Sequence, residues 1–136
     1  MGKMCPINTA KFRFEFDSST GILYKYYYGP ITIDDLTGSW DYAIENKLIP
    51  ATVKGFILDY REAYFRLSST DREEIPRYYK RWLNVFGSRK IAILTLNPKD
   101  IVVPILVRRQ DSGYHSQPFS TLEAAICWIL GEIPGS

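Results

Sequence analysis

Three hydroxyl side chains, Ser68, Ser69 and Thr70, lie between an apolar run and a segment with helical periodicity. Hydroxyl groups at a helix start can accept hydrogen bonds from free backbone N–H groups, or they can be phosphorylated. Thr70 with Glu73 matches a capping box, and Ser68 with Asp71 matches it less closely. The acidic residues of the same turn would repel a phosphate. The pattern therefore favours capping and leaves a phosphorylation site or a partner-contact loop as the alternative.

Two carboxylates, Asp59 and Glu62, follow the apolar run "GFIL" and flank Arg61. Functional groups of α/β proteins gather at the ends of parallel strands, so this pair could act as general acid and base. No substrate follows from the pattern. An aspartate at a strand end also accepts hydrogen bonds from nearby backbone N–H groups, and this structural role is the favoured interpretation.

Histidine and cysteine offer little chemistry. His115 is the sole histidine of the sequence, and the two cysteines, Cys5 and Cys127, are far apart. This spacing matches neither a metal site nor a catalytic triad nor a disulfide framework. We therefore predict no metal and no cofactor, and we expect His115 to lie exposed on an edge strand.

The segment "IVVPILVRR" (101–109) is apolar and ends in two arginines. We predict a helix over 101–107, bent at Pro104 because a proline ring does not fit a helix interior. Such a helix could form a lid over an apolar ligand, with Arg108 and Arg109 at its mouth to meet an anionic head group.

Basic residues cluster on or beside a helix that the apolar periodicity predicts over 75–86. They are Arg72, Arg77, Lys80, Arg81, Arg89 and Lys90. Basic residues interleaved with aromatic ones can bind single-stranded nucleic acid. Tyr78 and Tyr79, however, fall on the apolar stripe of the helix and are expected in the core. Nucleic-acid binding is thus disfavoured, and a charge-guided protein contact is the alternative.

The elements that must position these residues alternate between strands and helices. Period-two and period-3.6 patterns predict strands over 11–17, 22–29, 54–60, 89–96 and 114–119, and helices over 33–48, 75–86, 101–107 and 120–131. The order predicts an α/β fold: an N-terminal β-hairpin, then crossover units in a mainly parallel sheet of about five strands with four helices. We expect one domain over 11–131, with a flexible tail at 1–10 and a frayed tail at 132–136.

The predicted hairpin is rich in aromatic residues. Phe12, Phe14 and Phe16 share one face of its first strand and could pair with tyrosines of the second. If helices cover only one face of the sheet, the other face carries exposed aromatic area that would suit a dimer or an apolar ligand. Burial of both faces within the monomer is the equal alternative.

Composition is typical of a soluble globular protein. The 136 residues are 46% hydrophobic and 24% charged, and the net charge of +2 is too small to indicate nucleic acid by itself. No apolar run is long enough for a signal peptide or a membrane span. Reduced cysteines and the absence of a leader favour a cytoplasmic location.

Four segments carry a resemblance to a known family. They are "YYYGPITIDDLTGSWDYAIEN", "GFILDYREAYF", "KIAILTLNP" and "PFSTLEAAICWIL". From about Lys11 to Leu130 the chain resembles STAS domains, most closely the small stand-alone bacterial proteins grouped with CRAL-TRIO domains. The resemblance implies a SpoIIAA-like beta-alpha superhelix that binds a protein partner in bacterial regulation, without enzyme activity.

The resemblance also implies a role for the hydroxyl cluster. In the antagonists of this family a kinase phosphorylates a serine beside the helix start, the place that Ser68 and Ser69 occupy here. The family pattern has an aspartate before the serine pair and a glycine after it, where this chain has Leu67 and Thr70. Self-association is a further expectation. A carrier of a lipid or other apolar ligand and, more weakly, an enzyme using Asp59 or Glu62 are the alternative functions.

Overall fold

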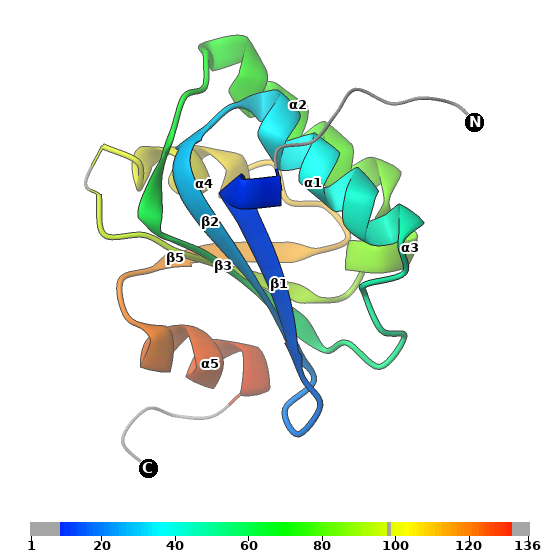
Figure 1. Ribbon diagram of the computed structural model, residues 1–136. Coiled ribbons are helices and arrows are strands. Elements are labelled where there is room, and N and C mark those ends of the chain that lie inside the picture. The colour runs from blue at the N-terminus through cyan, green and yellow to red at the C-terminus, as the bar shows by residue number, and fades with distance from the viewer. Residues whose placement is uncertain (1–8, 98, 132–136) are drawn as a thin grey trace.

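The computed structural model describes residues 9–97 and 99–131, which form one five-stranded sheet with helices on both faces (Figure 1). The strands are β1 (Phe12–Asp17), β2 (Ile22–Ile31), β3 (Gly55–Phe65), β4 (Lys90–Leu94) and β5 (His115–Phe119). The helices are α1 (Ile33–Glu45), α2 (Ser69–Arg81), α3 (Leu83–Phe86), α4 (Val102–Arg108) and α5 (Leu122–Leu130), preceded by a 3-10 turn, η1 (Thr9–Lys11). The tails predicted at 1–10 and 132–136 lie outside the described residues, apart from residues 9 and 10.

The sheet has the order β1-β2-β3-β4-β5. β1 and β2 form an antiparallel hairpin, and β2, β3, β4 and β5 then pair in parallel. Gly21 closes the hairpin with a φ of +79°, a left-handed conformation that glycine adopts without a steric penalty. The predicted α/β fold, with its N-terminal hairpin and mainly parallel sheet, is confirmed.

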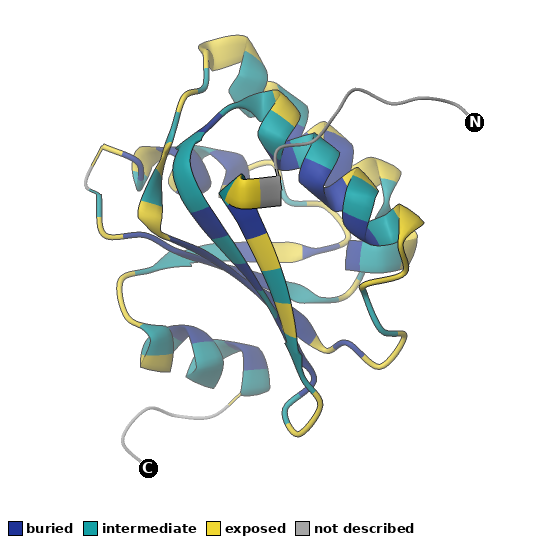
Figure 2. Ribbon diagram, viewed as in Figure 1, coloured by how far each residue is buried: buried dark blue, intermediate teal, exposed yellow. Residues whose placement is uncertain are grey.

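One apolar cluster lies on each face of the sheet. The larger cluster packs β1–β4 against α1, α2, α3 and α4, and the smaller one packs the opposite face against α5. The buried residues follow the sheet and the inward sides of the helices (Figure 2). Since α5 is the only helix on its face among the described residues, the β1 side of that face stays open (Figure 1).

The phenylalanine row of β1 faces the larger cluster. The rings of Phe12 and Tyr42 are 5.8 Å apart, and those of Phe14 and Trp40 are 5.9 Å apart. The tyrosines that share the opposite face of the hairpin, Tyr24, Tyr26 and Tyr28, are half-buried. The phenylalanines are therefore core residues of the monomer, whereas the tyrosines border an open face.

The described residues form five α-helices rather than the predicted four. The helical segment after β3 breaks at Trp82, where φ is −112°, and continues as the short α3. Its first turn also lies earlier than predicted, because α2 begins at Ser69 and runs through Pro76. The apolar area that Ile75, Pro76 and Tyr79 bury offsets the free energy lost with the hydrogen bond that the proline removes.

α4 is helical, as predicted for 101–107, but proline does not interrupt it. The helix starts at Val102, so Pro104 lies in its first turn. Backbone N–H groups of the first turn have no acceptor within the helix, and a proline there costs little.

Candidate functional site

Ser68 is the N-cap of α2. Its hydroxyl oxygen accepts a hydrogen bond from the N–H of Asp71 at 3.1 Å, and the Asp71 carboxylate accepts one from the N–H of Ser68 at 2.9 Å. This reciprocal capping box is the one that matched less closely in the sequence. The pair of Thr70 and Glu73 does not form one, because Thr70 already lies within the helix. The preceding residue, Leu67, packs against the larger core cluster.

The three hydroxyl groups differ in their freedom. Ser68 Oγ is held by the cap and lies 3.1 Å from Thr70 Oγ1. Ser69 is exposed, and its hydroxyl makes no hydrogen bond within the described part of the chain. Ser69 can therefore be modified or contacted without loss of the cap, whereas modification of Ser68 would remove it.

Thr70 borders an open groove of about 440 Å³ between α1 and α2. The groove is lined by Ile33, Asp34, Thr37, Asp41, Thr70, Asp71, Glu74, Arg77, Tyr78 and Arg81. Glu74 lies 3.6 Å from Arg77 and 3.7 Å from Arg81, so one carboxylate is shared by two guanidinium groups. The four acidic and two basic side chains leave this groove with an excess of negative charge.

The Tyr78 hydroxyl donates a hydrogen bond of 2.6 Å to Asp41 across the groove. Burial and this neighbouring carboxylate raise the pKa of Tyr78 above its ordinary value. This hydrogen bond connects α1 to α2 and so holds the two helices that border the groove together.

Asp59 lies within β3 rather than at its end, which corrects the prediction. β4 stops opposite Asp59, but β3 continues to pair with β2 after a register shift between Tyr26 and Tyr28. Both carboxylate oxygens of Asp59 accept hydrogen bonds from the Arg61 guanidinium, the shortest of them 2.7 Å. Asp59 Oδ1 also accepts the backbone N–H of Arg61 at 3.0 Å, which is the structural role that the sequence favoured.

An open groove of about 690 Å³ surrounds this ion pair. It is lined by Arg13, Tyr26, Tyr27, Tyr28, Asp59, Arg61, Glu62 and Leu96. The structure thus brings Asp59 and Glu62 to one surface, but Arg61 occupies the carboxylate that would have to exchange a proton. Asp59 therefore does not suit general acid–base chemistry, which needs a carboxylate free to reach its substrate.

The segment predicted as a lid covers little space. The cavity between α4 and the sheet has a volume of about 20 Å³ and is lined in part by Tyr60, Pro104 and Val107. This volume suits about one water molecule. Arg108 and Arg109 are exposed at the end of the helix. The described residues therefore leave no chamber for a lipid beneath α4.

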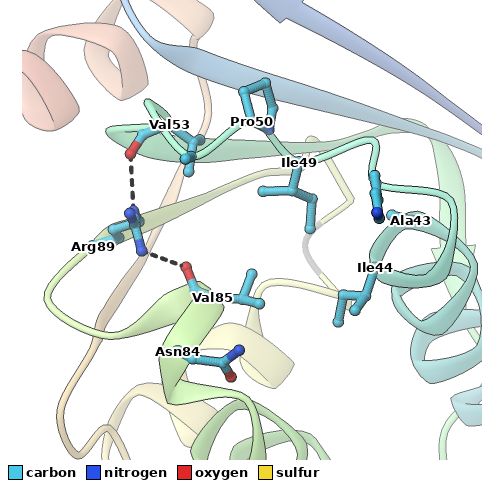
Figure 3. A pocket seen from close by; sticks show the side chains of 10 residues that line it. Ala43, Ile44, Ile49, Pro50, Val53, Asn84, Val85 and Arg89 are labelled. Atoms are coloured by element: carbon cyan, nitrogen blue, oxygen red, sulfur yellow. Dashed lines mark hydrogen bonds between the residues drawn. The ribbon is translucent and has the colours of Figure 1, made fainter.

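A shallow apolar pocket of about 310 Å³ lies near the C-terminal end of α1 (Figure 3). Ile44, Ile49 and Val85 contribute to its walls. Arg89 links its two sides, because its guanidinium donates hydrogen bonds of 2.9 Å to Val53 O and 2.8 Å to Val85 O (Figure 3). This pocket lies at the opposite end of α1 from the hydroxyl cluster.

Sequence reasoning missed a fully buried lysine. Lys25 is 0% exposed, and its Nζ atom donates a hydrogen bond to the hydroxyl of Ser39. The Lys25 Nζ atom lies 4.0 Å from the ring centre of Trp40 and 4.5 Å from that of Tyr27. Burial lowers the pKa of Lys25 well below its ordinary value, and Asp41 opposes this only in part. The strand alternation was the available signal, because it groups Lys25 with Leu23 and Tyr27.

The remaining candidates lie apart from these grooves. His115 is exposed on the edge strand β5, as expected. Tyr78 and Tyr79 are buried, so they cannot stack on bases. Over residues 9–97 and 99–131, no cluster of three or more histidine, cysteine or acidic side chains could hold a metal ion. Across the same residues, no helix has the length and apolarity to cross a bilayer.

Comparisons with known proteins identify the fold. No protein-family profile matches the chain, and no curated protein sequence matches it. An uncharacterized protein of the DUF3478 family from Shewanella loihica PV-4, described as having a SpoIIAA-like fold, superposes with a TM-score of 0.59 at 16% identity, over 87% of this chain and 91% of that one. The anti-sigma factor antagonist SpoIIAA in its unphosphorylated form gives 0.51 at 15% identity, over 88% and 98%. The chain therefore has a STAS-like, SpoIIAA-like fold, as its sequence segments indicated.

Proposed function

We propose that this chain is a non-catalytic regulatory module that binds a protein partner on the helix-side surface formed by α1 and α2. We call this the α1–α2 surface and define it by Asp34, Thr37, Ser69, Thr70 and Glu74. The carrying observation is the open, acidic groove that Thr70 borders, with the exposed Ser69 next to Thr70 in the chain. Regulation would act through that hydroxyl.

The fold supports this proposal. The similar solved structure of SpoIIAA is that of an anti-sigma factor antagonist, and its description as unphosphorylated names the modification that such a protein can carry. Ser68, Ser69 and Thr70 are our candidate phosphoacceptors, and Ser69 is the one whose modification leaves the capping box intact.

Charge indicates the kind of partner. Excess carboxylates along the groove favour a basic surface, and complementary charge accelerates association and excludes wrong partners. A phosphate on Ser69 adds roughly −2 charge beside the groove, so it changes both the charge and the bulk that a partner meets. Partner affinity is therefore expected to depend on the modification.

A crosslinking experiment tests the surface. A photoreactive residue at Thr37, in the groove, should capture a partner in the host that the same residue at Glu123, exposed on α5, does not. Titration calorimetry with that partner should then show at least tenfold weaker binding for Asp34→Lys and a change below twofold for Glu123→Lys. Equal effects of the two substitutions would place the partner elsewhere.

The modification needs its own test. Native mass spectrometry of protein purified from its host should reveal a phosphorylated fraction, with the phosphate on Ser69. Ser69→Glu should change partner affinity at least fivefold, whereas Ser112→Glu, in an exposed loop, should not. Unchanged affinity for Ser69→Glu would remove the switch but leave the docking surface standing.

A further inference from the structure

β1 is an open edge of the sheet. The strand order places β2 on one side of β1 and no strand of the described chain on the other. Edge strands present unpaired backbone N–H and C=O groups and can pair with a further strand. The side chains of β1 indicate which kind of strand can pair with this edge.

The sequence of this edge is complementary to itself. In "KFRFEFD" basic residues stand before Phe14 and acidic residues after it. If two copies pair antiparallel with Phe14 opposite Phe14, Arg13 of each copy lies opposite Glu15 of the other. Cross-strand pairs of opposite charge stabilise an antiparallel pairing, and like charges directly opposite destabilise it.

Other registers lose this match. A shift that places Arg13 opposite Arg13, or Glu15 opposite Glu15, brings like charges together. A shift by one residue puts phenylalanines opposite charged residues and mixes the two faces. The pairing centred on Phe14 is thus the register in which the charges match and the phenylalanines stay on one face.

The charged side chains are already oriented on the open face. The Arg13 guanidinium lies 4.2 Å from the ring centre of Tyr26, whose hydroxyl donates a 3.2 Å hydrogen bond to Glu15. Within one chain Arg13 and Glu15 are 3.7 Å apart and remain 55% and 60% exposed. α5 packs against β3, β4 and β5, so it leaves room over β1 for the side chains of a second copy.

The other face supplies apolar contact. Phe14 and Phe16 are only half-buried, although both pack against the larger core cluster. In the register centred on Phe14, the two Phe14 rings meet, and Phe16 of each copy lies opposite Phe12 of the other. These contacts would remove apolar area from water.

From this complementarity we propose that β1 is a self-association surface: two copies pair antiparallel about Phe14 and join their sheets into one continuous sheet. This is a closed, two-fold contact in which each copy presents the same strand. It uses neither α1 nor α2 for docking and is independent of the proposed regulatory surface.

Charge substitutions test the proposal, because single substitutions should weaken the dimer and complementary ones should restore it. Analytical ultracentrifugation of the full chain should detect a dimer, and Arg13→Glu or Glu15→Arg should each raise its Kd about tenfold or more. Mixing the two single variants should restore association as a heterodimer, since every opposing pair is then of opposite charge. The double variant Arg13→Glu, Glu15→Arg should restore the homodimer.

Lys80→Glu is the matched control, because it makes the same charge change on the exposed side of α2. It should leave the Kd within twofold. A wild-type chain that stays monomeric at high micromolar concentration would overturn the proposal, as would a dimer whose Kd neither single variant, Arg13→Glu or Glu15→Arg, changes. Restoration in the mixture could not come from misfolded chains.

Discussion

The Lys25 Nζ atom lies 4.0 Å from the ring centre of Trp40, in the core between β2 and α1. A charged ammonium there is attracted by the ring but loses its hydration, and no carboxylate contacts it among the described residues. Burial is the stronger effect, since it lowers the pKa of Lys25 despite the attraction of Asp41. Compared with water, the core therefore disfavours the charged form of Lys25.

This burial predicts how stability depends on pH. The pKa of Lys25 is lowered from 10.5, so the unfolded chain binds more protons than the folded chain between the lowered value and 10.5. The contribution of Lys25 to the free energy of unfolding should therefore rise with pH between the lowered value and 10.5 and fall as pH drops through that range. Urea denaturation at several pH values measures this slope.

Lys25→Met isolates the lysine as the cause. The variant should be more stable at pH 7 by about 2 kcal/mol, because it removes the cost of placing an amine in the core. It should also remove the pH dependence that Lys25 contributes below 10.5. A variant less stable than the wild type, with the slope unchanged, would mean that the amine stabilises the core.

Local periodicity predicted much of this architecture. The alternation in β1 and β2 and the apolar stripes of α1, α2 and α5 are properties of short segments, so the elements and their order could be read directly. The faces of β2 were also predicted. The burial of Lys25 was not, because a lysine in a strand is ordinarily exposed, and only the packing of α1 over this position reverses that.

Other features depended on distant segments. The second half of β3 reads as polar because of Arg61 and Glu62, and it is a strand only because β2 pairs with it beyond the end of β4. Among the hydroxyls, Ser68 rather than Thr70 forms the cap, beside Leu67, which packs against the larger core cluster. Such contacts join parts of the chain that sequence periodicity does not relate.

The cap assignment is testable by paired substitutions. Ser68→Ala should lower the free energy of unfolding by about 1 kcal/mol, because the N–H of Asp71 loses its acceptor. Thr70 is the second residue of the helix, and Thr70→Ala should change the free energy of unfolding by less than about 0.5 kcal/mol. Chemical denaturation of both variants at one pH measures the two changes. A larger effect at Thr70 would favour the other capping box that the sequence offered, that of Thr70 and Glu73.

Asp59 is expected to stabilise the fold rather than take part in catalysis. Asp59→Ala removes its hydrogen bonds to the backbone N–H and guanidinium of Arg61 and should cost about 1–2 kcal/mol. Glu62→Ala, at an exposed neighbour, should stay within about 0.5 kcal/mol. Thermal unfolding compares the two, and a cost at Glu62 equal to that at Asp59 would contradict the structural role.

The docking of α5 depends on a glycine at the start of β3. A Cβ atom on Gly55 would lie 2.5 Å from Ile129 Cγ2 and 3.1 Å from the backbone oxygen of Lys90, so Gly55→Ala forces the helix away from the sheet. We expect a loss of about 2 kcal/mol, typical of overpacking. Hydrogen exchange should show faster exchange in α5.

Gly38→Ala is the matched control, because a Cβ atom there meets nothing within 4 Å and the residue lies inside α1. Alanine favours helix over glycine, so this variant should gain about 0.5–1 kcal/mol. The same chemical change thus has opposite effects at the two glycines. A neutral result at Gly55 would mean that α5 can move off the sheet at little cost, and the open face beside β1 would then extend beneath that helix.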